Sequence, residues 1–264
     1  MSDPSATTPR LAWRGVSKRF GDAQVLDHFD LDVPTGRSLV IIGGSGQGKS
    51  VAIKLALGLL APDAGVIALD GVDLAALSAR ARRAQYGRMG VLFQSAALFD
   101  SLSVWENVAF RLLNADHVAR PDARARALVA LERVRLSPDV AARYPSELSG
   151  GMQKRVGLAR AIVADPEILF FDEPTTGLDP ITAAAINALI VDQVKRLGCT
   201  AISITHDLAS ARTIGHEIAL LHAGRITWRG PAADLDHSGN PHVEQFITGG
   251  ASPLPLGEAQ SGRG

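Results

Sequence analysis

The feature that most constrains the fold is a glycine-rich loop between an apolar run and a helical pattern. Residues 38–42 form a short apolar run of the kind that makes a buried strand. The loop that follows satisfies G-x-x-x-x-G-K-[ST], and its residues are Gly43, Gly44, Ser45, Gly46, Gln47, Gly48, Lys49 and Ser50. Apolar residues recur from Val51 to Leu59, which predicts a largely buried helix that Gly58 weakens near its end. A strand, a glycine loop and a helix in this order form the structural context of a phosphate-binding loop.

The chemistry of the loop supports this interpretation. Small residues let backbone N–H groups approach phosphate oxygens, and the helix N-terminus adds a positive potential. Lys49 is predicted to reach the β- and γ-phosphates of ATP, and the Ser50 hydroxyl to ligate Mg²⁺. The alternative is a glycine-rich turn with an incidental lysine, and the complete motif favours phosphate binding.

A second apolar run, residues 168–171, ends in two acidic residues. Asp172 is predicted to hold Mg²⁺, directly or through water, and Glu173 to polarise the water that attacks the γ-phosphate. Solvated acids at a strand end are the simpler alternative. The upstream loop makes the catalytic interpretation the stronger one.

A second glycine motif, Ser149-Gly150-Gly151, opens another predicted helix. Ser149 is a good N-cap, and apolar residues follow at helical spacing until Pro166. This helix tip could also bind phosphate. One molecule has no obvious use for both loops on the same ATP, whereas two molecules facing head to tail would use both.

Together these motifs resemble those of the ATP-binding cassette (ABC) ATPases, over nearly the whole chain. Four smaller signals follow the family's order: Phe20, Gln94, Asp179 in Gly-Leu-Asp, and His206 after an apolar strand. The resemblance implies that Phe20 stacks on adenine and that Gln94 contacts Mg²⁺ and water. It also implies that Asp179 contacts the other protomer and that His206 hydrogen-bonds the γ-phosphate and attacking water.

Each of these four residues has a purely structural alternative. Phe20 could be a core aromatic side chain, and Gln94 could cap a strand end. Asp179 could be only the N-cap of a helix that begins at Pro180. His206 could be an ordinary surface residue, although neutral imidazole can both donate and accept a hydrogen bond.

The resemblance implies an α/β fold: a P-loop NTPase (RecA-like) core with an antiparallel β subdomain and an inserted helical subdomain. Helical, Arg/Ala-rich patterning before residue 165 agrees with the insertion. The expected ABC ATPase domain covers 11–247, with core and β subdomain in 11–93 and 165–247, and the helical subdomain with the signature motif in 94–164. We expect residues 1–10 to be a flexible N-terminus and the Gly/Pro/Ser-rich residues 248–264 to be a mobile tail.

The composition limits which other partners and locations are expected for this chain. The formal net charge is zero, which argues against a nucleic-acid footprint over the whole surface. Cys199 is the only cysteine, so no intramolecular disulfide can form, and a reducing cytoplasm is expected. No signal peptide and no apolar run of about 18 residues is found, so we expect a separate polypeptide to cross any membrane.

The segment 94–110 resembles the corresponding segment of the Mla/Mce lipid-transport ATPases, which share the run Q-S-x-A-L-F-D-S-L-[ST]-V-x-E-N-V-A-F. Ser103 and Glu106 form a capping box, which predicts a helix start. The apolar residues of the segment either pack the helical insertion internally or line a groove for a permease's coupling helix; they are Leu98, Phe99, Leu102 and Trp105. Val51 also fits this subgroup, since most ABC transporters carry Thr there, and it offers phosphate only its backbone N–H. Arg135 departs from the subgroup, whose members usually have Gly.

This resemblance implies an ATP- and Mg²⁺-dependent motor that moves phospholipid or another hydrophobic lipid between the membranes of a Gram-negative bacterium. The expected partners are a second copy of the chain, multi-span permease subunits docking near residues 95–110, and an Mce-domain lipid-binding protein, with no nucleic acid. The expected location is the cytoplasmic face of the inner membrane, as a peripheral subunit. Two alternatives stay open. One is the ATPase of an importer for a small polar solute, and the other is a non-transport ABC ATPase.

Overall fold

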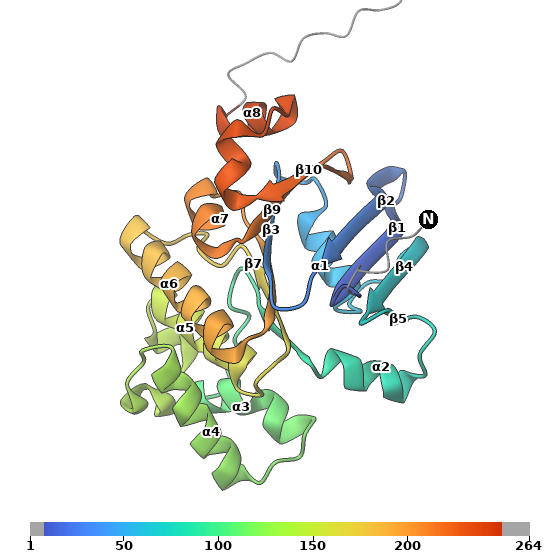
Figure 1. Cartoon of the computed structure of the whole chain (residues 1–264). Coiled ribbons are helices and arrows are strands. Elements are labelled where there is room, and N and C mark those ends of the chain that lie inside the picture. Colours follow the sequence, from blue (N-terminus) through green and yellow to red (C-terminus); the bar gives the residue numbers. More distant parts are fainter. Residues whose placement is uncertain (1–7, 250–264) are drawn as a thin grey trace, which may run out of the picture.

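The computed structural model describes residues 8–249, so the predicted mobility of residues 1–7 and 250–264 lies outside the described residues. Its centre is a six-stranded sheet in the order β10-β9-β3-β8-β7-β6 (Figure 1). The strands are β3 (Ser38–Ile42), β6 (Met89–Leu92), β7 (Ile168–Asp172), β8 (Thr200–Ile204), β9 (Glu217–His222) and β10 (Arg225–Pro231). All neighbouring pairs are parallel except β9 and β10, so the phosphate-loop strand β3 lies in the middle of a parallel sheet.

A second, antiparallel sheet has the order β2-β1-β4-β5. Its strands are β1 (Leu11–Phe20), β2 (Ala23–Val33), β4 (Ala64–Leu69) and β5 (Val72–Asp73). Helix α1 (Lys49–Ala56) packs between this sheet and the parallel one (Figure 1). The antiparallel β subdomain expected from the sequence is therefore present.

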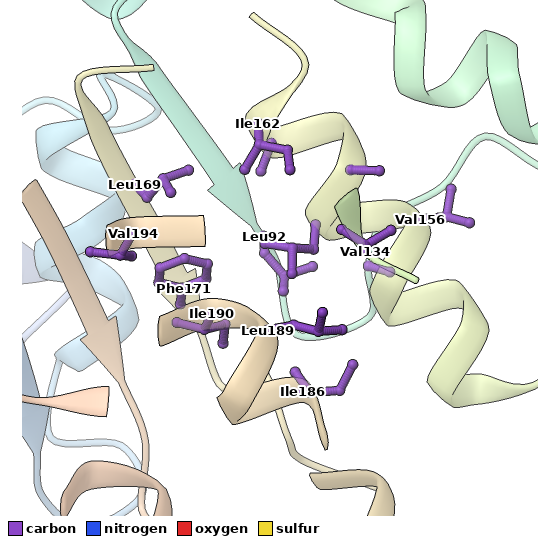
Figure 2. Close-up of a cluster of buried hydrophobic side chains, with 14 of the residues drawn as sticks. Leu92, Val134, Val156, Ile162, Leu169, Phe171, Ile186, Leu189, Ile190 and Val194 are labelled. Carbon is purple, nitrogen blue, oxygen red and sulfur yellow. The ribbon is translucent and has the colours of Figure 1, made fainter. Parts of the chain in front are cut away.

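The parallel strands are buried on both faces because their apolar residues alternate between two cores. Leu39 and Ile41 of β3 join the core that contains α1 and the antiparallel sheet, whereas Val40 and Ile42 join the opposite core. The opposite core contains side chains of helices α3 (Val104–Asn114), α4 (Arg120–Arg133), α5 (Gly150–Ile162) and α6 (Pro180–Leu197). Figure 2 shows part of it, with Leu169 and Phe171 of β7 beside side chains of these helices.

The remaining elements are helices, and those labelled η are short 3-10 helices. They are α2 (Ala79–Tyr86), α3 (Val104–Asn114), α4 (Arg120–Arg133), η1 (Pro138–Ala142), η2 (Pro145–Glu147), α5 (Gly150–Ile162), α6 (Pro180–Leu197), α7 (Leu208–Ile214), η3 (Ala232–His237) and α8 (Pro241–Ile247). Helices α3, α4 and α5 come between β6 and β7, and α3 and α4 lie together at one end of the molecule (Figure 1). This is the predicted helical insertion. Within residues 8–249, no helix has both the length and the apolar character needed to cross a bilayer.

The helix after the phosphate loop is shorter than predicted. Helix α1 ends at Ala56, and Leu59 is 58% exposed instead of buried. Gly58 has a left-handed φ of 67°, and the N–H groups of Gly58 and Leu59 donate to the carbonyls of Leu55 and Lys54. This is a Schellman termination, which glycine favours because it has no Cβ. The sequence predicted a weak helix end near Gly58, whereas the spacing of apolar residues extended the helix to Leu59.

Candidate active site

The phosphate loop connects β3 to α1 through several glycines, and at Gly43 and Gly48 a larger residue would be strained and too close to neighbouring backbone. Gly43 has a φ of 152°, and a Cβ there would lie 2.4 Å from the carbonyl oxygen of Leu221. Gly48 has a φ of 98°, and its Cβ would lie 2.8 Å from the carbonyl oxygen of Val25. Backbone strain and close contact thus both explain why glycine stands at these positions.

A cavity of about 690 Å³ opens above this loop. Its lining residues are Phe20, Val25, Ser45, Gly46, Gln47, Gly48, Lys49, Ser50, Val51, Gln94, Glu173 and His206. All of them except Val25 were predicted as site residues from the sequence. Phe20 and Val25 come from the antiparallel sheet. The others converge because β3, β6, β7 and β8 are parallel, so the loops that follow these strands emerge at one edge of the sheet.

Lys49 begins helix α1 and is held close to the loop. Its Nζ donates hydrogen bonds to the carbonyl oxygens of Gly43, at 2.7 Å, and Gly44, at 2.8 Å. Burial lowers the pKa of Lys49, while the nearby carboxylates of Glu173 and Asp172 act in the opposite direction. The ammonium group therefore lies at the cavity, close to the predicted phosphate position.

Ser50 and Asp172 meet although 122 residues separate them in the chain. The Ser50 hydroxyl donates to Oδ1 of Asp172 at 3.0 Å. Asp172 is buried at the end of β7, and this burial raises its pKa. Hydroxyl and carboxylate oxygens are hard ligands of the type that Mg²⁺ prefers, so this pair fits the predicted metal position.

Glu173 is fixed in one orientation at the end of β7. It has a left-handed φ of 49°, and its backbone N–H donates to the carbonyl oxygen of Ile204 at 2.9 Å. Its Oε2 accepts hydrogen bonds from Oγ1 of Thr176 and from Nδ1 of His206, each at 2.9 Å. With Glu173 ionised, Nδ1 of His206 must carry a proton. The Nε2 of His206 has no hydrogen bond within the described part of the chain, and the imidazole is 61% exposed beside the cavity.

The second glycine motif lies outside this cavity. Ser149 is the N-cap of α5, and its Oγ accepts from the N–H of Met152 at 3.3 Å. Ser149, Gly150 and Gly151 are not among the residues that line the cavity. A Cβ on Gly151 would lie 2.7 Å from Cγ2 of Thr182, so α5 begins beside the start of α6.

Asp179 lies at that same start of α6. As the N-cap, it accepts from the N–H groups of Ile181 and Thr182 at 3.0 and 2.9 Å. Asp179 and Ser149 are both exposed, and neither lines the cavity. The tips of α5 and α6 thus form an exposed surface of the single chain.

The apolar residues of the segment after Gln94 differ in burial. Glu106 accepts from the N–H and Oγ of Ser103, which confirms the predicted helix start. Phe99 is 44% exposed, stacks on Phe110 with ring centroids 4.5 Å apart, and borders a groove of about 440 Å³. Leu98 and Trp105 instead pack against the core.

Three residues at the site were missed by sequence reasoning. Val25 comes from an alternating strand with no motif, and Thr176 is one of two adjacent threonines after the acidic pair. Lys154 is buried on α5, where its Nζ donates to the carbonyl oxygens of Gln94 and Glu173. A lysine within a helix otherwise rich in small and apolar residues is the only signal that could have drawn attention to it.

Comparisons with known proteins agree with this geometry. Residues 26–176 match the family model described as ABC transporter. The chain is 39% identical over 238 residues to the probable ribonucleotide transport ATP-binding protein Mkl of Mycobacterium leprae, covering 89% of this chain and 68% of that protein. It is 37% identical over 244 residues to the intermembrane phospholipid transport system ATP-binding protein MlaF of Escherichia coli K12, covering 92% and 90% of the two chains.

A plant protein and solved structures extend the similarity. The chloroplast protein trigalactosyldiacylglycerol 3 of Arabidopsis thaliana is 38% identical over 252 residues, which are 89% of this chain and 72% of that protein. The dimeric ABC cassette MJ0796 superimposes with a TM-score of 0.77 and 29% identity, covering 84% and 98% of the two chains. Its post-hydrolysis dimer bound to ADP and Pi gives a TM-score of 0.76 with the same identity and coverage.

The parallel core, phosphate loop and helical insertion therefore define a P-loop NTPase of the ATP-binding cassette type. The chain belongs to the ABC transporter family, as an ATP-binding and ATP-hydrolysing subunit.

Proposed function

We propose that this chain is the ATPase of a complex that moves phospholipid, or another hydrophobic lipid, between the two membranes of a Gram-negative bacterium. The similarity to MlaF carries this proposal, because it extends over 92% of this chain and 90% of a phospholipid-transport subunit. The Arabidopsis relative, whose name is that of a galactolipid, supports the same substrate class. The chain would act as a peripheral subunit at the cytoplasmic face of the inner membrane.

In this proposal ATP binds in the cavity above the phosphate loop. The loop residues Gly43 to Val51 surround the phosphates, Lys49 contacts the β- and γ-phosphates, and Phe20 stacks on adenine. Ser50, Asp172 and Gln94 are the residues that would hold Mg²⁺, which neutralises phosphate charge when bound. The observed pairing of Ser50 with Asp172 supports this assignment.

Glu173 and His206 act on the attacking water and the γ-phosphate. Glu173 accepts hydrogen bonds from Thr176 and His206 at Oε2, which leaves Oε1 available to orient water. His206 holds Glu173 through Nδ1, and its Nε2 remains to contact the γ-phosphate. The contact between these two side chains therefore supports a shared catalytic role.

The second half of each site comes from another copy of the chain. Ser149, Gly150 and Gly151 carry the positive end of α5 but do not line the cavity of their own chain, and Asp179 lies beside them. A head-to-tail pair would bring this surface to the γ-phosphate bound by the partner, and the dimeric structure of the similar cassette MJ0796 supports the pairing of two copies. We assign residues 11–247 to this single ATPase domain.

The permease is proposed to dock near residues 95–110. The groove bordered by Phe99 and Phe110 takes lining residues from both sides of Gln94 in the chain, Phe93 and Ala97, and it also includes Arg160. An apolar groove of this kind accepts an amphipathic helix from a partner. A permease and an Mce-domain lipid carrier complete the proposed complex.

Replacing Phe20 with alanine is expected to weaken ATP binding about five-fold, because the loss of one aromatic stacking contact costs on the order of 1 kcal/mol. Phe20 is 48% exposed at the cavity, so its removal leaves the core intact and the melting temperature unchanged. Isothermal titration with a non-hydrolysable ATP analogue measures the effect. Substitution of exposed Val72 by alanine is the matched control, and unchanged affinity in Phe20→Ala would contradict adenine stacking.

Lipid transport is tested with the complex purified from its own host through a tagged copy of this chain. We expect a permease and an Mce-domain protein to co-purify, and ATP to drive transfer of a fluorescent phospholipid in proteoliposomes. The same complex with Glu173→Gln should not transfer lipid. A second candidate, ribonucleotide transport, is suggested by the name of the mycobacterial relative. ATP-dependent uptake of a ribonucleotide without lipid transfer would replace the lipid proposal with that candidate.

A further inference from the structure

Lys154 is a buried lysine whose hydrogen bonds go to backbone carbonyls of two catalytic segments. It lies on α5, and the residue is only 5% exposed. Its Nζ donates to the carbonyl oxygen of Gln94 and, at 3.2 Å, to that of Glu173. Burial lowers the pKa of Lys154, while Glu173 and Asp172 act in the opposite direction. One ammonium group thus joins the ends of β6 and β7 to the helix that starts at Ser149.

Arg160 holds the next part of the same loop. Its guanidinium group donates to the carbonyl oxygen of Ala97 at 2.6 Å and to that of Ala96. Ala96 and Ala97 have φ values of 60° and 47°, a left-handed conformation that is unfavourable for residues other than glycine. Two consecutive strained residues persist only where neighbouring groups hold them, and Arg160 supplies such contacts.

Close packing brings α5 against this loop. A Cβ on Gly157 would lie 2.7 Å from Cδ1 of Leu92 and 3.2 Å from Cβ of Ala96, so glycine allows the approach. Gly157 lies three residues after Lys154 and three before Arg160, which places all three on neighbouring turns of α5. Helix α5 and the loop after β6 therefore form one packed unit.

We propose that Lys154 is a positioning residue for hydrolysis, which sets the backbone of Gln94 and Glu173 relative to the α5 tip. Arg160 supports it by holding Ala96 and Ala97 in their strained conformation. A permease that docks in the groove would move these segments together, since Arg160 borders both the groove and the loop. The inference rests on the proposed roles of Gln94, Glu173 and Ser149.

Lys154→Met removes the donors while nearly preserving side-chain length. Because displacement of a catalytic group by about 1 Å can cost about 10²-fold in rate, we expect kcat for ATP to fall about 10²-fold. ATP affinity should stay within about two-fold, because Lys154 does not line the cavity. The measurements are kcat and the ATP dissociation constant of the full chain, alone and with its permease. Rates are expressed per ATP-binding site, so unfolded molecules do not count.

Two further variants make the test specific. Lys154→Gln retains an N–H donor and should recover about five- to ten-fold in kcat over Lys154→Met, within the range for a well-placed hydrogen bond. Arg155→Met is the matched control, because this neighbour contacts the carbonyl of Arg135 and not the catalytic segments. Its kcat should equal that of the unmodified chain.

Hydrogen exchange gives a readout independent of turnover. The amide of Ala96, which donates to the carbonyl of Phe93, should exchange faster in Lys154→Met than in Arg155→Met. An unchanged kcat in Lys154→Met, or an equal loss of ATP binding and turnover, would overturn the inference. Retained turnover in Glu173→Gln of the otherwise unmodified chain would instead show that the proposed catalytic role of Glu173 is wrong.

Discussion

Replacing Glu173 with glutamine is expected to reduce ATP turnover by about 10²- to 10⁴-fold, the range for loss of a catalytic base. ATP affinity should stay within about two-fold, because the phosphate loop is unchanged. The amide oxygen of glutamine can still accept from Thr176 and His206, so the local hydrogen bonds survive. What the variant loses is the negative charge that polarises water.

Two quantities are measured for this variant: the rate of ATP hydrolysis per binding site, and the oligomeric state of the protein. With ATP bound and hydrolysis blocked, Glu173→Gln should accumulate as a dimer in light scattering, in the presence of its permease if necessary. The matched control is Glu132→Gln on the exposed face of α4, which should hydrolyse ATP normally. Turnover within ten-fold of the unmodified chain would remove Glu173 from its proposed role, and a monomer with ATP and permease would contradict the ATP-dependent pair.

Mixing two inactive variants is expected to restore ATP hydrolysis if each site uses two chains. Lys49→Met removes the lysine from the phosphate loop, and Ser149→Glu places a negative charge at the tip of α5, where it repels the γ-phosphate. Glutamate near a helix N-terminus does not oppose the helix dipole, so α5 should remain folded. In a mixed head-to-tail dimer, one site carries both defects and the other carries none.

An equal mixture should therefore reach about a quarter of the unmodified activity, since about half of the two-fold dimers are mixed and each has one intact site. Turnover is measured after the variants are co-expressed with different tags. Lys49→Met mixed with Glu173→Gln is the control, and it should stay inactive because both residues act on the same bound ATP. If the mixture of Lys49→Met and Ser149→Glu is no more active than either variant alone, the site is complete within one chain.

The sequence alone was sufficient to predict the segments whose structure depends on local spacing. The strands before Gly43 and Asp172 are continuous apolar runs, and both form where predicted. The capping box at Ser103 and Glu106 uses residues three apart, so it could also be found without knowledge of the fold. The order of the motifs was enough to predict the family and the fold class.

Sequence spacing was less informative where distant segments determine the outcome. The helix after the phosphate loop stops at Ala56 because Gly58 adopts a left-handed conformation, and a Cβ there would lie 2.2 Å from Oη of Tyr86. Val25 reaches the cavity from β2, which has no motif of its own. The apolar residues at helical spacing predicted a helix after Ser149, but they gave no sign that Lys154 on this helix is buried as well.

The sequence by itself thus determined the chemistry that this protein carries: a phosphate loop, two acids after a strand and a second glycine-led helix. These depend on residues adjacent in the chain, where residue type and spacing directly set the local conformation. The tertiary structure alone decided which of these groups meet. Ser50 reaches Asp172, His206 reaches Glu173 and Lys154 reaches Gln94 because parallel strands and a packed helix bring distant backbone segments together.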